Sequence, residues 1–167
     1  LEMEKIEAIL GKIKSDPETE DVKRTELDLW EKIKKKSLGG RRTGLGITAE
    51  GDMLAALGMR YGSEKAIDFA VEVQQNLAVE AYRSSVNMAA ERGAFPIYDT
   101  KREEHNPMID RIRTVDPELY ALMSKVGRRN ISLLTIAPTG TTSLMTQTTS
   151  GIEPVFLPFY IRRRKVN

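Results

Sequence analysis

The spacing of apolar residues predicts that the first part of the chain is helical. Apolar side chains recur at i, i+3, i+4 and i+7 near the N-terminus, which predicts an amphipathic helix over about residues 3–14; they are Ile6, Ile9, Leu10 and Ile13. Ser15-Asp16-Pro17-Glu18 breaks this helix and predicts the start of a second one, with Ser15 or Asp16 as its N-cap. The second helix is expected to end at Gly39-Gly40. Residues 1–38 are therefore predicted to form a helical hairpin.

Residues 39–128 are predicted to continue as a helical segment. A short helix is expected over 52–57, and the longest helix over 63–92, with Ser63 as its cap and Gly93 at its end. Small residues fill the middle of the long helix and predict close packing rather than chemistry; they are Ala78, Ala81, Ser84, Ser85, Ala89 and Ala90. Residues 94–107 are predicted to be a polar loop, followed by a helix from Asp116-Pro117 to Gly127.

Residues 129–167 have a different pattern, which predicts strand, turn, short helix and strand. The apolar run Ile131–Ile136 predicts a strand buried on both faces, and Ala137-Pro138 ends it because proline has no N–H to donate to a sheet. A second strand is predicted over Val155–Ile161, where Pro158 indicates a bulge or an edge. The fold class predicted is α/β and helix-rich, with few strands.

The turn between the first of these strands and the short helix is a candidate phosphate site. It has one glycine and several hydroxyl groups over Thr139–Ser143, before Leu144 and Met145 resume an apolar pattern. A strand followed by a hydroxyl-rich helix start directs N–H and O–H donors toward one spot, which suits an anion. The lysine of a Walker A loop is missing, so a P-loop ATPase is not predicted. Threonine and serine are also ordinary N-caps, and composition alone leaves that plainer interpretation open.

Charge and composition exclude several other classes of protein. The net charge is +2, which favours neither a nucleic-acid-binding protein nor one whose charge attracts acidic substrates. The basic run Arg162–Lys165 is predicted to be a solvated tail. No apolar run reaches membrane-spanning length and the N-terminus is not a signal peptide, so we predict a cytoplasmic protein without a membrane partner. His105 has Glu103 and Glu104 beside it, but consecutive residues rarely converge on one ion, so we predict no metal site.

Two blocks of sequence resemble the catalytic subunit of ribonucleotide reductases, and the adenosylcobalamin-dependent class II branch in particular. The first block is Asn130–Ser143 followed by Thr149–Phe156, and the second is Gly40–Thr48 followed by Gly51–Gly58. The resemblance extends over nearly the whole chain, in the family's own order. An iron-dependent class I subunit is the alternative within the family. Outside it, the alternative is a helical interaction or regulatory domain that has kept the family's sequence but lost its chemistry.

The resemblance implies a fold, a substrate and a cofactor. The family's catalytic domain is a ten-stranded α/β barrel around the substrate nucleotide, so residues 1–167 are expected to be one fragment of that barrel, with the rest of the subunit as partner. It implies adenosylcobalamin as cofactor of the full-length enzyme, with none bound by this fragment. The family's Pro-Thr-Gly-Thr-Thr turn grips the substrate phosphates, which assigns that role to Pro138, Thr139, Gly140, Thr141 and Thr142.

The chain has no cysteine, and this limits what it can do alone. It excludes disulfides, thiolate metal sites and cysteine nucleophiles within these residues. The resembled family reduces ribose through a thiyl radical and a redox-active cysteine pair, so no catalytic residue is assigned here and the isolated chain is expected to be inactive. The two predicted strands, cut from a barrel, would have unpaired edges, and we expect the chain to self-associate through 131–136 and 155–161.

Overall fold

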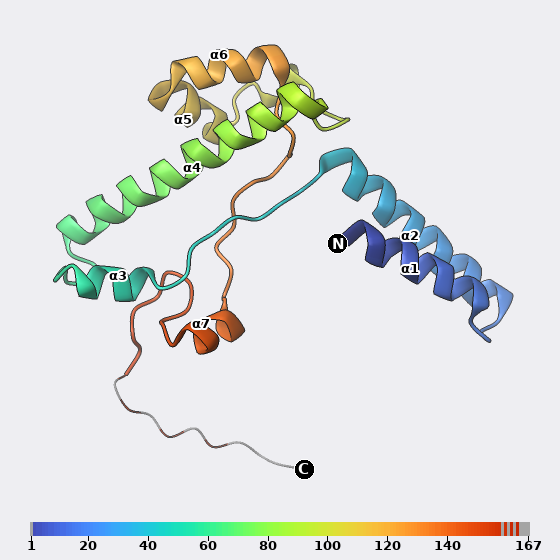
Figure 1. Cartoon of the computed structure of the whole chain (residues 1–167), viewed down its shortest axis with the longest axis horizontal. Helices are drawn as coiled ribbons and strands as arrows, with labels where there is room; N and C mark the ends of the chain where they lie inside the picture. The colour runs from blue at the N-terminus through green and yellow to red at the C-terminus, as the bar shows by residue number, and fades with distance from the viewer. Residues whose placement is uncertain (1, 158, 160, 162, 164–167) are drawn as a thin grey trace. The chain divides into compact units, whose positions relative to one another are not determined.

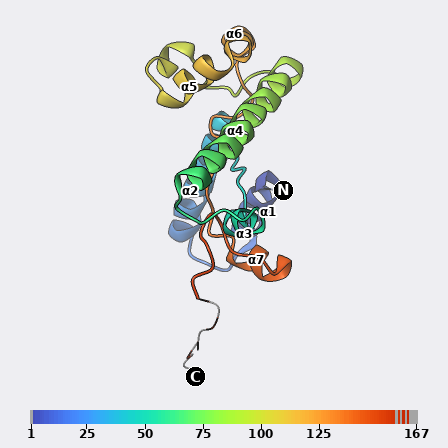
Figure 2. The same ribbon diagram turned by 90° about the vertical axis from the view of Figure 1, so that its left-hand side faces the viewer.

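The computed structural model describes residues 2–157, 159, 161 and 163, and their backbone is mostly helical (Figures 1 and 2). The helices are α1 Glu2–Ser15, α2 Glu20–Gly40, α3 Glu50–Ala56, α4 Glu64–Arg92, the 3-10 helix η1 Thr100–Glu103, α5 Pro107–Val115, α6 Pro117–Val126 and α7 Gly140–Thr146. The chain divides into two compact units. The first unit contains residues up to Thr43 and Tyr82–Leu133, and the second contains Gly44–Ala81 and residues from Leu134 onward. The helix-rich character that the sequence predicts is confirmed.

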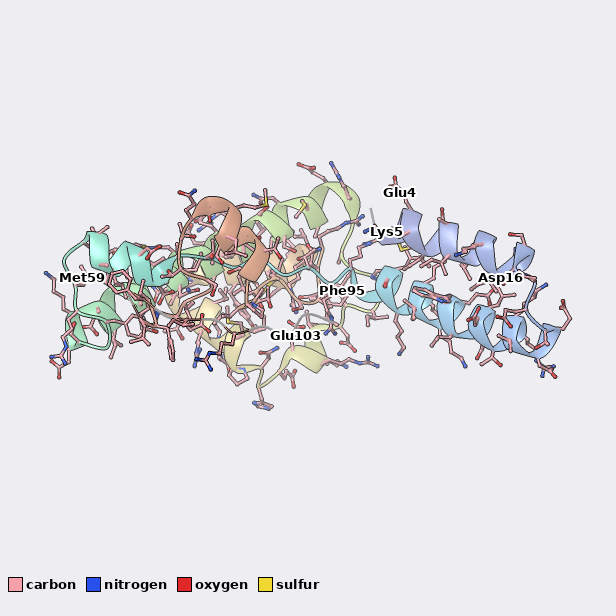
Figure 3. All side chains as sticks on the ribbon, turned by 90° about the horizontal axis from the view of Figure 1, so that it is seen from below. Glu4, Lys5, Asp16, Met59, Phe95 and Glu103 are labelled. Atoms are coloured by element: carbon pink, nitrogen blue, oxygen red, sulfur yellow. The ribbon has the colours of Figure 1, made fainter. Side chains whose placement is uncertain are left out.

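In the first unit, α1 and α2 form the predicted helical hairpin and lie side by side in Figures 1 and 3. Ile6 and Ile13 of the predicted apolar stripe are buried. The N-cap of α2 was wrongly predicted, because it is Thr19 rather than Ser15 or Asp16. Ser15 still belongs to α1, where its hydroxyl donates to the Lys12 carbonyl oxygen at 3.0 Å, so the turn between the helices begins later than expected.

A buried arginine organises the rest of the first unit. Arg128 is 2% exposed, and its Nη2 donates to Glu103 Oε1 at 2.8 Å while Nη1 pairs with the other carboxylate oxygen. Its guanidinium carbon lies 5.4 to 5.8 Å from the centroids of the aromatic rings of Tyr82, Phe95 and Tyr98. We call these five residues the arginine cage; Figure 3 labels two of them, Phe95 and Glu103. The cage joins α4, the loop after it, η1 and the segment after α6.

Close packing of the small residues of α4 is confirmed for four of the six that were predicted, whereas Ser84 and Ala90 are exposed. Ala78, Ala81, Ser85 and Ala89 are buried. The Ser85 hydroxyl donates to Asn130 Oδ1 at 2.9 Å and accepts from the Asn130 amide at 3.1 Å, so the segment after α6 lies directly against this helix. The Asn130 side-chain amide in turn donates to the Arg41 carbonyl oxygen at 2.8 Å. A larger side chain at position 85 would displace this contact.

Helix α5 begins at Pro107, the last residue of the predicted polar loop, and extends through residues 108–115, for which no element was predicted. Asn106 caps it, since the Asn106 side chain accepts from the Met108 amide at 3.0 Å, and Pro107 occupies the first turn. Ile109 and Ile112 are buried, and α5 packs on α6, whose Leu119 is also buried. The Asn-Pro start and the i, i+3 isoleucine pair were the available signals for this helix. The predicted helix α6 is confirmed, including its start at Asp116-Pro117 and its end at Gly127, where φ is +76°.

The predicted strand Ile131–Ile136 is not formed. Among the described residues the structure contains helices and one isolated parallel bridge, between Leu45 and Leu134. Ile131 N donates to Gly40 O, Thr43 N to Ser132 O, and Thr135 N to Leu45 O, each at 2.9 Å. A strand needs a neighbour that stays in register over several residues, whereas this pairing is interrupted. Burial on both faces was also wrong, because Leu133 is buried but Ile136 is 64% exposed.

The second predicted strand is only partly described. Val155, Phe156 and Leu157 are exposed and form no strand, whereas Pro158 and Tyr160 of this prediction lie outside the described residues. The predicted tail Arg162–Lys165 also lies outside them, except for Arg163. No helix built from described residues is both long and apolar enough to cross a membrane, and a cytoplasmic location stays a prediction.

The arginine cage makes a first prediction about stability. Removing one partner of a buried ion pair leaves the other charge unpaired, which costs about 3–5 kcal/mol. Glu103→Gln is therefore expected to lower the free energy of unfolding by about 3 kcal/mol, measured by urea denaturation followed by circular dichroism. The control is Asp28→Asn, which removes an exposed ion pair with Lys32 and should change stability by less than about 1 kcal/mol. Equal effects of the two variants would contradict a dominant role of the cage.

Asp116 makes a second prediction, about acid stability. Its hydrogen bond from the Leu119 amide, together with Arg83, lowers the pKa of the Asp116 carboxyl below its ordinary value of 3.8. A lowered pKa means that the group stabilises the fold above about pH 3.8 and loses this contribution as pH falls through the lower folded-state pKa.

Asp116→Asn keeps a helix cap but cannot ionise, so its thermal midpoint is expected to fall less steeply below pH 3.8 than that of the wild type. Asp28→Asn is the control, because it makes the same chemical change at an exposed position in the middle of α2, where the side chain caps no helix. The measurement is the thermal midpoint by circular dichroism across this acid range. A wild-type profile for Asp116→Asn would contradict the prediction.

Candidate functional site

The candidate site is the start of α7 in the second unit, which we call the phosphate turn and define as Pro138–Thr142. Thr139 is the N-cap of α7, and the first helical bond runs from the Ser143 amide to the Thr139 carbonyl oxygen at 2.8 Å. The amides of Gly140, Thr141 and Thr142 precede this bond, so helix geometry gives them no acceptor within α7. Pro138 and residues 140–142 are exposed, so these donors are accessible to a ligand.

Thr139 differs from its neighbours because its hydroxyl is already bonded. Thr139 Oγ1 accepts from the Gly151 amide at 2.8 Å and lies 2.9 Å from Thr48 Oγ1. The Thr48 hydroxyl donates its one proton to the Thr149 carbonyl oxygen at 3.2 Å, so the Thr139 hydroxyl must be the donor to Thr48. These bonds form a directed chain that ties the turn to two segments remote in sequence. The resemblance assigns Thr139 to phosphate binding, which stays a prediction; in the structure its hydroxyl is bonded to Thr48 and Gly151.

The loop after α7, residues 148–151, is held by the start of α3. The Thr149 amide donates to Asp52 Oδ2 at 2.8 Å, and the Glu50 amide donates to the Gly151 carbonyl oxygen at 3.3 Å. Glu50 is 7% exposed, and its carboxylate accepts from the Gln74 side chain at 3.0 Å. In Figure 1, the loop that follows α7 accordingly runs between α7 and α3. Sequence reasoning gave Thr48 and Asp52 no role, although both lie in the second family-like block.

Glycines in the same block allow backbone segments to approach closely. A Cβ at Gly46 would lie 2.2 Å from the Thr135 carbonyl oxygen, and one at Gly51 would lie 2.6 Å from that of Glu153. Close packing of backbone segments is thus what these glycines provide. Arg41 is not part of the turn, since it belongs to the first unit and donates to the Ala94 carbonyl oxygen at 2.9 Å.

The chemistry available at the phosphate turn is binding of an oxyanion by neutral donors. Its residues carry no ionisable side chain, so they can supply hydrogen bonds but no acid–base catalysis. The described residues contain no group of three or more His, Asp or Glu side chains that could hold a metal ion. His105 is exposed after η1, where its φ is +66°.

Comparison with known proteins adds an independent line of inference. The family model described as "Ribonucleotide reductase, barrel domain" matches residues 21–167. A vitamin B12-dependent ribonucleoside-diphosphate reductase of Mycobacterium tuberculosis is 35% identical over 123 residues, which is 73% of this chain and 15% of that protein. The protein of the same name in Thermoplasma acidophilum is 32% identical over 79% of the chain and 15% of its own length. A ribonucleoside-diphosphate reductase subunit alpha of Chlamydia pneumoniae is 30% identical over 77% of the chain and 14% of its own length.

The close approach at Gly46 makes a third prediction. Gly46→Ala is expected to break the Leu45–Leu134 bridge, because the added methyl group would overlap the Thr135 carbonyl group. Such overpacking should cost about 1–3 kcal/mol and speed hydrogen exchange of the Thr135 amide, which NMR can follow.

The matched control for this variant is Gly11→Ala in α1. A Cβ there meets nothing within 4 Å, and alanine favours a helix by about 0.5–1 kcal/mol over glycine. This variant should therefore be slightly more stable and should leave exchange at Thr135 unchanged. Unchanged exchange at Thr135 in Gly46→Ala would show that the pairing tolerates the methyl group.

Proposed function

Because the chain belongs to the ribonucleotide reductase barrel-domain family, we propose that it forms part of the catalytic subunit of an enzyme that reduces ribonucleotides to deoxyribonucleotides. The observation that supports this most is the family match, which includes residues 21–167 and both family-like blocks. The chain spans about 15% of the length of the relatives in Mycobacterium and Thermoplasma. Its proposed share of the function is therefore a local one, namely holding the substrate.

The phosphate turn is the proposed point of contact with substrate. Pro138, Gly140, Thr141 and Thr142 are exposed, and the first-turn amides have no acceptor within α7. The Thr141 and Thr142 hydroxyls are short, neutral donors on the exposed first turn, suited to phosphate oxygens. Thr139 belongs to the cradle through its backbone position, while its hydroxyl holds the turn in place.

The proposed substrate is a ribonucleoside diphosphate, by analogy with the names of the relatives. Relatives with vitamin B12-dependent names favour adenosylcobalamin as the cofactor of the whole enzyme, where it would supply the radical that starts ribose reduction. The relative named subunit alpha keeps the class I alternative open.

The described residues do not by themselves fit the cofactor. The only histidine, His105, is exposed after η1 and offers no enclosed site for a corrin ring. No step of the proposal therefore passes through cobalamin. The chain also has no cysteine, so the thiol chemistry of such an enzyme is proposed to come from elsewhere in the subunit.

The rest of the catalytic subunit is the proposed partner, and the ten-stranded barrel is the proposed setting. Three strongly exposed apolar side chains support this proposal, because burying them against the rest of the subunit would be favourable. They are Leu144, Met145 and Phe156, which are 81%, 82% and 90% exposed. Self-association of the isolated chain through residues 131–136 and 155–161 stays part of this proposal. A helical interaction or regulatory domain derived from the family is the second candidate, favoured by the absence of cysteine, and it predicts no nucleotide binding.

The test is a calorimetric titration of the chain with ADP as the ribonucleoside diphosphate. We expect saturable binding that Thr141→Val weakens, because valine keeps the shape but removes a hydrogen bond to a charged oxygen. Such a bond contributes about 1.5–3 kcal/mol, which corresponds to a loss of roughly 10- to 150-fold in affinity. Thr142→Val should act in the same direction.

The control is Thr114→Val, which makes the same chemical change at an exposed position of α5 in the first unit. Its affinity for ADP should equal that of the wild type. Binding that is indifferent to Thr141→Val would contradict the role of the hydroxyl. No saturable binding at all would contradict a turn that works outside the whole subunit and would favour the second candidate.

A further inference from the structure

The backbone at Thr139 is in a conformation that its own residue type disfavours. Its φ is +46° and its ψ is +28°, in the left-handed region that a β-branched side chain rarely adopts. Such a conformation persists only when surrounding contacts fix it. The direction of the first amides of α7 depends on this residue, because Thr139 is the N-cap from which the helix starts.

The contacts that fix Thr139 come from two remote segments. The Thr139 hydroxyl donates to Thr48 Oγ1 at 2.9 Å and accepts from the Gly151 amide at 2.8 Å. One partner precedes α3 and the other follows α7, so the side chain of Thr139 is held from both sides. Loss of either bond would release the strained backbone.

The partners of Thr139 are held in turn at Thr149. Thr48 Oγ1 donates to the Thr149 carbonyl oxygen at 3.2 Å, and Asp52 Oδ2 accepts from the Thr149 amide at 2.8 Å. Thr48 and Asp52 therefore bind the two backbone polar groups of Thr149, its carbonyl oxygen and its amide, one on each side of the α-carbon. The hydroxyl of Thr149 is buried and has no hydrogen-bond partner among the described residues, so this side chain adds no tether of its own.

We propose that Thr48 and Asp52 are positioning residues of the phosphate turn. They hold residues 149–151 and Thr139 so that the exposed donors of residues 140–142 point at one phosphate group. This inference rests on the proposed function, because it concerns the same site. The Thr48 hydroxyl is bonded to Thr139 and Thr149, and Asp52 Oδ2 is bonded to Thr149, so the proposed role of both residues is exerted through Thr139 and Thr149.

The experiment compares Thr48→Val, Thr48→Ser and Asp52→Asn with the wild-type chain, using inorganic pyrophosphate as the probe. Valine removes the hydroxyl and keeps the shape, whereas serine keeps the hydroxyl. We expect Thr48→Val to weaken pyrophosphate binding about tenfold and Thr48→Ser to restore it to within about twofold. Asp52→Asn should weaken binding by less than Thr48→Val, because an amide oxygen still accepts from Thr149.

A second readout needs no ligand. The NMR shifts of the amides of Gly140, Thr141 and Thr142 should move in Thr48→Val and return in Thr48→Ser. Hydrogen exchange at the Gly151 amide should also be faster in Thr48→Val, because its acceptor Thr139 is released. Thr114→Val is the control for a threonine-to-valine change outside the network, and it should alter none of these signals.

A double variant separates positioning from a general loss of stability. If Thr48 acts through the turn, Thr141→Val should weaken binding less in the Thr48→Val background than in the wild type, since the donor is already misplaced. Additive effects, or unchanged shifts at residues 140–142 in Thr48→Val, would overturn the proposal. If the wild type binds no pyrophosphate, the proposed function fails, and the amide shifts alone then decide whether Thr48 sets the conformation of the turn.

Discussion

The first unit depends on a single charge kept out of water. Arg128 is almost fully buried, and its position is tolerable only because Glu103 neutralises it and Tyr82, Phe95 and Tyr98 enclose it. The five members of the cage come from four segments, namely α4, the loop after it, η1 and the segment after α6, so the charge is satisfied in one arrangement of those elements. The cage thereby fixes where the chain leaves α6. Asn130, two residues after Arg128, forms hydrogen bonds with the Ser85 hydroxyl and the Arg41 carbonyl oxygen. The segment after α6 is thereby linked both to α4 and to the end of α2.

The second unit is organised by weaker and more local interactions. A short chain of hydroxyl and amide bonds links Thr48, Thr139, Thr149 and Gly151, and Asp52 is the one carboxylate in it. Glycines at 46 and 51 let the backbone segments meet. The candidate site therefore depends on close backbone packing and on which groups donate and which accept in a few hydroxyl and amide hydrogen bonds. The amides and hydroxyls left exposed at the start of α7 are those that this network does not use.

Helices could be predicted from the sequence because their signals are local. Apolar spacing located α1, and the Asp116-Pro117 start and the glycine at 127 located α6. Helix α5 was missed because polar neighbours obscured Ile109 and Ile112. The strand at 131–136 was wrong because a strand depends on its partners, which local sequence does not specify. The phosphate turn was found from its residue types, but the bond from Thr139 to Thr48 joins residues 91 positions apart and left no local signal.

The donor and acceptor directions of the hydrogen bonds made by the Thr48 and Thr139 hydroxyls limit which residues these two positions can tolerate. Thr48 donates to a carbonyl oxygen, so it can serve Thr139 only as an acceptor. If position 139 loses its hydroxyl, position 48 keeps a partner but the Gly151 amide loses its acceptor; if position 48 loses its hydroxyl, the proton of Thr139 has no destination. Either single change leaves a polar group without its partner, and loss of both hydroxyls would leave the Gly151 amide and the Thr149 carbonyl oxygen without theirs. In related sequences, a residue with a hydroxyl group, threonine or serine, is therefore expected at both position 48 and position 139.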